Sequence, residues 1–178
     1  MNAPTVATSS ARLLAAYANE YDLELCHFDV DQAFVRADLK EDVFMRLPEG
    51  CGALSGKNVN LNKSLHGLRQ ASRPWYAMLK KCILALGFEQ CLADSCVFRL
   101  IRGGIVVLIL VVHVDDIFAV GKERCDQFGE DLNRMVPVKN LGELKWYSGC
   151  FYERDREAGL KISQQTYTEE LREKFDVR

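Results

Sequence analysis

A pair of acidic residues between two apolar runs constrains this chain more than any other feature. Ile105 to Val112 is an unbroken apolar run, Asp115 and Asp116 follow closely, and "IFAVG" occupies residues 117–121. Such runs predict two buried strands joined in a hairpin that turns at Asp115-Asp116. Burying adjacent carboxylates is unfavourable. The pair is therefore either a plain turn, where Asp is common, or a site that holds a cation.

A third carboxylate favours the cation site. Asp29 lies near the end of "LELCHFDV", residues 23–30, which reads as a strand. If this strand neighbours the hairpin, three carboxylates meet at one end of a sheet, and Mg²⁺ prefers such oxygen ligands. Two ions about 3.5–4 Å apart can promote in-line displacement at phosphorus. Asp31 competes with Asp29 for this role, although it can equally be a solvated residue at a helix start.

Periodicity along the chain predicts an α+β fold, with an antiparallel sheet and helices packed on one face. Residues 38–70 are polar and irregular, which predicts loops and short strands. The helices are expected near residues 10–20, 72–86, 122–136 and 165–175. The strands are expected in "LELCHFDV", "CVFRLI", "IVVLILVVHV", "IFAVG", "KWYSGCFYE" and "LKISQ".

Composition narrows the classes of protein further. The 178 residues suit one domain, and a formal charge of −2 gives no general attraction to nucleic acid or membranes. The longest apolar run is too short to cross a bilayer, so no membrane partner is expected. The seven cysteines include no CxxC pair, and residues 1–10 lack an apolar signal. We expect reduced thiols in an intracellular protein, cytoplasmic or nuclear. Cys82, Cys91 and Cys96 match no zinc spacing and are interpreted as core residues.

Five segments, in order, resemble the reverse transcriptase of copia-type LTR retrotransposons. "FDVDQAF" at 28–34 is similar to the first catalytic motif, and "HVDD" at 113–116 is similar to the hairpin with the paired aspartates. "KSLHGLRQASRPWY" at 63–76 resembles the motif that opens the palm helix. "LGELKWYSG" at 141–149 and "ERDREAGLKISQQTYTEELREKF" at 153–175 resemble later palm motifs and the start of the thumb.

The resemblance implies an RNA-directed DNA polymerase that transfers nucleotides from dNTPs to a primer 3′-OH on an RNA or DNA template. Its implied cofactor is Mg²⁺ as two ions, with Mn²⁺ as a substitute. By position, it implies a catalytic and metal-binding set of Asp29, Asp115 and Asp116 with the backbone of Val30. It implies nucleotide contacts at Val30, Phe34, Gly67 and Leu68, where the ring of Phe34 would exclude a ribose 2′-hydroxyl. It implies template or primer contacts at Arg69, Gln70 and Arg73.

The resemblance also implies one reverse-transcriptase-like domain across residues 1–178. Residues 1–37 and 71–155 would form a polymerase palm, 38–70 part of the fingers, and 156–178 the start of the thumb. Upstream finger strands and an RNase H domain would lie outside the chain, so a longer polyprotein is expected. The chain departs from the family pattern at five positions, which concern nucleotide and template contacts more than the metal site: Asn60, Asn62, His66, Ser72 and His113. The alternative is an inactive, truncated or repurposed remnant that serves at most as a nucleic-acid-binding or protein-binding module.

Overall fold

The computed structural model describes residues 3–39, 41–68, 71–155 and 157–176. The chain forms two compact units, one from Gln32 to Lys81 and one that combines Pro4–Asp31 with the chain from Cys82 onward. The long apolar segments of the sequence all fall in the second unit. That unit therefore contains the main sheet and the predicted carboxylate site.

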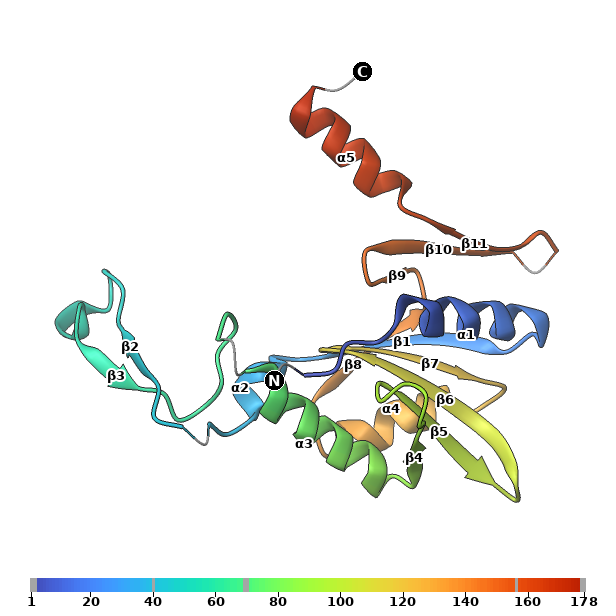
Figure 1. Cartoon of the computed structure of the whole chain (residues 1–178), viewed down its shortest axis with the longest axis horizontal. Coiled ribbons are helices and arrows are strands. Elements are labelled where there is room, and N and C mark those ends of the chain that lie inside the picture. Colours follow the sequence, from blue (N-terminus) through green and yellow to red (C-terminus); the bar gives the residue numbers. More distant parts are fainter. Residues whose placement is uncertain (1–2, 40, 69–70, 156, 177–178) are drawn as a thin grey trace. The chain divides into compact units, whose positions relative to one another are not determined.

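The main sheet of the second unit has six strands in the order β4-β5-β6-β7-β1-β8 (Figure 1). Each neighbouring pair is antiparallel. The expected α+β fold with an antiparallel sheet is therefore confirmed. The strands are β1 (Glu24–Val30), β4 (Phe88–Gln90), β5 (Val97–Arg102), β6 (Ile105–His113), β7 (Asp116–Gly121) and β8 (Val138–Glu143).

Two helices cover opposite faces of this sheet: α1 (Thr8–Glu20) and α4 (Cys125–Asn133). Side chains alternate along β1, so Phe28 and Leu25 lie on different faces. The rings of Phe28 and Phe128 of α4 are 5.4 Å apart, whereas Tyr17 of α1 lines a cavity with Val120, the register partner of Leu25. The prediction that the helices pack on one face is therefore wrong for these two. The central strands are buried on both faces, and each face needs cover.

The second unit continues into a smaller antiparallel sheet of order β11-β10-β9 and a terminal helix. These elements are β9 (Trp146–Tyr147), β10 (Cys150–Asp155), β11 (Gly159–Ser163) and α5 (Gln165–Phe175). The guanidinium of Arg154 on β10 donates to the backbone oxygens of Leu23 and Ala18. The predicted hairpin and last helix are confirmed, but the predicted strand "KWYSGCFYE" is divided at Ser148-Gly149 into β9 and β10, which pair with each other.

The first unit contains the irregular segment that the sequence predicts. Its short elements are α2 (Ala33–Arg36), a hairpin of β2 (Phe44–Arg46) with β3 (Asn58–Asn60), and the 3-10 turn η1 (Gly52–Leu54). The predicted helix is also present as α3 (Ser72–Ala85), which begins in this unit and ends in the other. Among the described residues, no helix has the length and apolar character needed to cross a membrane.

Candidate functional site

The acidic hairpin turns one residue earlier than predicted. His113 ends β6 and pairs with Asp116, the first residue of β7, so Val114 and Asp115 form the two-residue turn. The buried pair Val112↔Ile117 sets this register, because a slip by one would turn apolar side chains to the wrong face. Asp115 therefore lies in the turn, whereas Asp116 belongs to the strand ladder.

Val114 adopts a strained backbone conformation at this turn, with φ 60°. A β-branched residue at positive φ is an outlier, and the first position of such a hairpin turn usually carries glycine. Strain of this kind costs roughly 1–3 kcal/mol and clusters at functional sites. The turn is therefore held in place by the buried strands on either side of it.

Asp29 lies directly opposite Asp116 on the neighbouring strand. The two residues are Cα partners in the β1–β7 ladder, and the backbone N–H of Val30 donates to the Asp115 carbonyl oxygen at 3.0 Å. Two adjacent strand ends thus bring Asp29, Asp115 and Asp116 to one end of the sheet. Val30 itself is buried and ties the end of β1 to the turn.

The negative charges at this sheet end act on one another. Burial raises the pKa of the Asp29 carboxyl, and the charges of Asp115, Asp116 and Asp31 raise it further, while Lys139 lowers it. The Lys139 ammonium lies 2.6 Å from Asp31, and this hydrogen bond raises the lysine's own pKa. The result is an acidic cluster in which Lys139 supplies a partial counter-charge at its edge.

Asp29, Asp115 and Asp116 are close neighbours at this end of the sheet, and the convergence of their carboxyl groups on one metal site stays a prediction. Among the described residues, Glu24, Cys26 and Cys125 form the one set of three or more potential metal ligands whose ligand atoms all lie within 4.8 Å of one another.

His27 is a member of this site that the sequence reasoning missed. Its Nε2 lies 2.9 Å from Oδ1 of Asp116, a geometry in which the ring N–H donates to the carboxylate. The histidine is only 7% exposed, and its ring meets Tyr147 edge-on. Alternation along β1 places His27 on the same face as Asp29, which is the signal that could have identified it.

Tyr147 lies buried beneath the acidic end of the sheet. Burial and the charge of Asp116 raise the pKa of its hydroxyl. Its ring also contacts His113 and Phe118, at centroid distances of 6.1 and 5.6 Å. This aromatic cluster supports the face of the hairpin from which Asp116 projects.

Of the residues predicted to contact nucleotide or template, Phe34, Gly67, Leu68 and Arg73 belong to the first unit, whereas Val30 ends β1 in the second. Phe34, in α2, is half-buried and places its ring edge-on to His66 at 5.4 Å. Gly67 has φ 94°, a conformation that glycine tolerates, and Leu68 follows it. Arg73 is exposed near the start of α3. Arg69 and Gln70 lie outside the described residues, and the binding roles of all these residues stay predictions.

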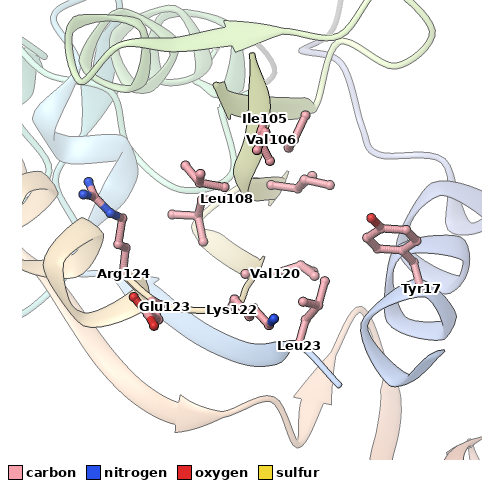
Figure 2. Close-up of a pocket in the computed structure, with 12 residues that line it drawn as sticks. Tyr17, Leu23, Ile105, Val106, Leu108, Val120, Lys122, Glu123 and Arg124 are labelled. Atoms are coloured by element: carbon pink, nitrogen blue, oxygen red, sulfur yellow. The ribbon is translucent and has the colours of Figure 1, made fainter. Parts of the chain in front are cut away.

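A cavity of about 330 Å³ lies at the other end of the central strands (Figure 2). Tyr17 projects toward it from α1, and the opposite wall comes from the start of β6 at Ile105 and the end of β7 at Gly121. The aspartates lie at the far end of both strands, and none of them lines this cavity. The cavity is therefore separate from the acidic site.

Comparison with known proteins agrees with the motifs and the acidic hairpin. The family model described as "Reverse transcriptase (RNA-dependent DNA polymerase)" matches residues 1–178. The chain is similar to the retrovirus-related Pol polyprotein from transposon TNT 1-94 of Nicotiana tabacum, with 32% identity over 98% of this chain and 14% of that protein. It is similar to the corresponding polyprotein of transposon RE1 of Arabidopsis thaliana, with 32% identity over 94% of this chain and 12% of that protein.

A shorter match links the chain to a yeast element. The truncated transposon Ty1-A Gag-Pol polyprotein of Saccharomyces cerevisiae is 32% identical over 62% of this chain and 8% of that protein. No solved structure gives a significant match. The chain thus spans less than a sixth of the length of the curated relatives it matches.

Proposed function

Since this chain belongs to the reverse transcriptase (RNA-dependent DNA polymerase) family, we propose that it is the palm-centred part of a retrotransposon polymerase. The proposed reaction joins a dNTP to the 3′-OH of a primer annealed to an RNA or DNA template. The observation that carries the proposal is the placement of Asp29 opposite Asp116, with Asp115 in the adjoining turn. Nucleotidyl transfer needs carboxylates gathered at one point.

The donor set fits divalent cations. Reverse transcriptases generally use divalent metal ions, and we assign their site to Asp29, Asp115, Asp116 and the backbone of Val30, with two Mg²⁺ ions as occupants and Mn²⁺ as a substitute. When bound, such ions activate the attacking hydroxyl and stabilise the leaving phosphate oxygen. The pKa of Asp29 is raised first by burial and then by repulsion from neighbouring carboxylates, and a cation bound there would relieve that repulsion, which supports the assignment.

The protein itself contributes by holding the catalytic carboxylates in position. The β1–β7 ladder fixes the backbone of Asp29 against that of Asp116, and the hydrogen bond from His27 orients the Asp116 carboxylate. Correct placement of reacting groups supplies much of the catalysis in phosphoryl transfer. In this view Lys139 limits the repulsion within the cluster while no cation is bound.

Nucleotide and template recognition is assigned to the first unit. We propose that Phe34 excludes a ribose 2′-hydroxyl, and that Gly67 and Leu68 contact the incoming nucleotide. Arg69, Gln70 and Arg73 would contact the template or primer, where basic side chains neutralise phosphates. In the same proposal residues 1–37 and 71–155 are palm, 38–70 part of the fingers and 156–178 the start of the thumb.

Primer extension by the purified chain tests this function. Extension with Mg²⁺ or Mn²⁺ should require Asp115, so Asp115→Asn should abolish it. Glu89→Gln is a matched control, because Glu89 is an exposed carboxylate on β4. Extension that survives Asp115→Asn would contradict the assigned site.

The second candidate function is a remnant that binds nucleic acid or protein without catalysis. The observation that favours it is that the chain departs from the family pattern at positions that concern nucleotide and template contacts, among them Asn60, His66 and Ser72. Template–primer binding without metal-dependent extension, equal in the wild type and Asp115→Asn, would support this candidate over the polymerase.

A further inference from the structure

Two cysteines and a glutamate gather on the face of β1 opposite to the aspartate site. Glu24 and Cys26 alternate with His27 and Asp29 along β1, so they lie on the face that α4 covers. Cys125 is the first residue of α4. One ligand atom from each of Glu24, Cys26 and Cys125 lies within 4.8 Å of the others. This cluster plays no part in the proposed polymerase chemistry.

The geometry of the cluster suits a tetrahedral ion. Zn²⁺ binds thiolates at about 2.3 Å and carboxylates at about 2.0–2.2 Å, so two sulfurs on one ion lie about 3.8 Å apart. The separation of the ligand atoms in the structure, at most 4.8 Å, is compatible with that value. Glu143 is the register partner of Cys26 on β8 and is exposed, which makes its carboxylate a candidate fourth ligand in place of water.

The burial of the three side chains suits both the entry of an ion from solvent and its firm binding. Glu24 is exposed, Cys26 is half-buried and Cys125 is buried. An ion can therefore enter from solvent on the Glu24 side, while the buried sulfur provides a rigid inner ligand. Thiolate pairs select zinc and similar soft ions over Mg²⁺, which prefers oxygen.

The surrounding charges favour a cation. Glu24, Asp126 and Glu143 place three carboxylates around Cys26. Their negative potential is one that a divalent ion would neutralise.

We propose that Glu24, Cys26 and Cys125 form a structural binding site for Zn²⁺ or a similar soft divalent ion. The ion would tie the start of β1 to the start of α4. Since β1 carries Asp29 at its other end, this tie would fix the strand without entering the acidic site.

Thiol protection on the unmodified chain tests the proposal without any variant. The chain, kept reduced with a phosphine, is treated with an alkylating agent with and without one equivalent of ZnCl₂, and each cysteine is followed by mass spectrometry. Zn²⁺ should protect the half-buried Cys26, whereas the exposed Cys51 should react equally in both samples. Equal alkylation of Cys26 with and without Zn²⁺ would overturn the site.

Variants then identify the ligands. CoCl₂ should give a thiolate-to-cobalt charge-transfer absorption that ZnCl₂ removes and excess MgCl₂ does not. Loss of a residue that hydrogen-bonds to a metal ligand typically lowers metal affinity roughly 10–100-fold. Loss of a ligand itself, in Cys26→Ser or Glu24→Gln, should weaken Zn²⁺ binding by more than this. Cys51→Ser is the matched control and should bind as the wild type does.

Two results would reject the assignment. One is Co²⁺ binding without the charge-transfer band, and the other is unchanged Zn²⁺ affinity in Glu24→Gln, an exposed position whose replacement leaves the fold intact. Neither readout depends on polymerase activity, so failure here is distinct from failure of the proposed function.

Discussion

Nε2 of His27 lies 2.9 Å from Oδ1 of Asp116, and it joins a buried ring to the first residue of β7. The contact crosses between neighbouring strands, because Asp116 pairs with Asp29 and His27 pairs with Phe118. The Asp116 carboxylate is therefore oriented by a protein group before any cation binds. Partners of metal ligands fix the orientation of those ligands in this way.

Replacing His27 should affect catalysis more than folding. His27→Ala removes the donor to Asp116 and should lower the rate of primer extension by about 10–100-fold. His27→Gln retains an N–H donor and should restore part of the loss. Steady-state kinetics with varied Mg²⁺ would show the defect in metal dependence. An Ala variant that extends primer as well as wild type, at equal stability, would contradict this role.

Asp29→Asn should stabilise the metal-free chain at neutral pH. The folded-state pKa of Asp29 is raised above its ordinary value of 3.8, so ionisation of this group opposes folding. The loss of stability that this ionisation causes is absent below pH 3.8, and it appears as the pH rises through the raised pKa. The free energy of unfolding of Asp29→Asn should thus exceed that of wild type at pH 7, and the two should converge below pH 3.8.

Asp155→Asn provides a control of opposite sign. Backbone N–H groups of Ala158 and Glu157 lower the pKa of Asp155, so its ionised form supports folding above the ordinary pKa. This variant should be less stable than wild type at pH 7, and the difference should shrink as pH falls. Urea unfolding across pH measures both variants. A stabilising effect of Asp155→Asn at pH 7 would contradict the electrostatic account.

Phe34→Ala should weaken the discrimination against ribonucleotides in favour of deoxynucleotides. If the ring excludes a 2′-hydroxyl, its removal raises the ratio of ribonucleotide to deoxynucleotide incorporation in this chain or a longer active form. Phe44→Ala is the matched control, because Phe44 is an exposed aromatic residue in the same unit. An unchanged ratio in Phe34→Ala would remove Phe34 from the nucleotide site.

Val114→Asn should stabilise the hairpin. Val114 has φ 60°, and asparagine enters this region more readily than a β-branched residue. Relief of this strain should raise the free energy of unfolding by up to about 1 kcal/mol. Val112→Asn, at a buried position in the preceding strand β6, should instead be strongly destabilising. Urea denaturation of both variants measures these two changes in stability. A stabilising Val114→Asn beside a destabilising Val112→Asn would attribute the gain to relief of backbone strain at residue 114.

Gly129→Ala should destabilise the chain although alanine favours helices. A Cβ at Gly129 would lie 2.6 Å from Cε1 of Phe28, so α4 or the ring must move. Overpacking of this kind costs roughly 1–3 kcal/mol, more than the roughly 1 kcal/mol gained in helix propensity. Glu130→Ala, exposed on the same helix, should change stability little. A more stable Gly129→Ala would refute this close approach.

The sequence predicted elements that bury a clear apolar pattern. Periodicity located α1, α3, α4 and the β6–β7 hairpin, each of which buries apolar side chains, and it also located α5, whose apolar residues are exposed. Strand β8 was missed, since "VKNLGE" has one half-buried residue and is otherwise exposed at the sheet edge. Without β8, neither Lys139 beside Asp31 nor Glu143 opposite Cys26 could be foreseen.

The candidate site was predicted in part, for a similar reason. The family motifs pointed to Asp29 and the Asp115–Asp116 pair, and the β1–β7 ladder places them at one sheet end. The contact of His27 with Asp116 depends on the register between two strands, and the two residues are 89 positions apart in the sequence. The proximity of Cys26 and Cys125 likewise depends on tertiary packing, and no local spacing rule reports it.

The alternation of side chains along β1 determines which genetic changes the strand can accept. One face presents His27 and Asp29, and the other presents Cys26 and Phe28. Substitution at one position alters one face only. Insertion or deletion of a single codon inside β1 would exchange the two sets, because the side-chain period of a strand is two residues. We therefore expect natural length variation to avoid this strand and to collect in loops such as that between β2 and β3.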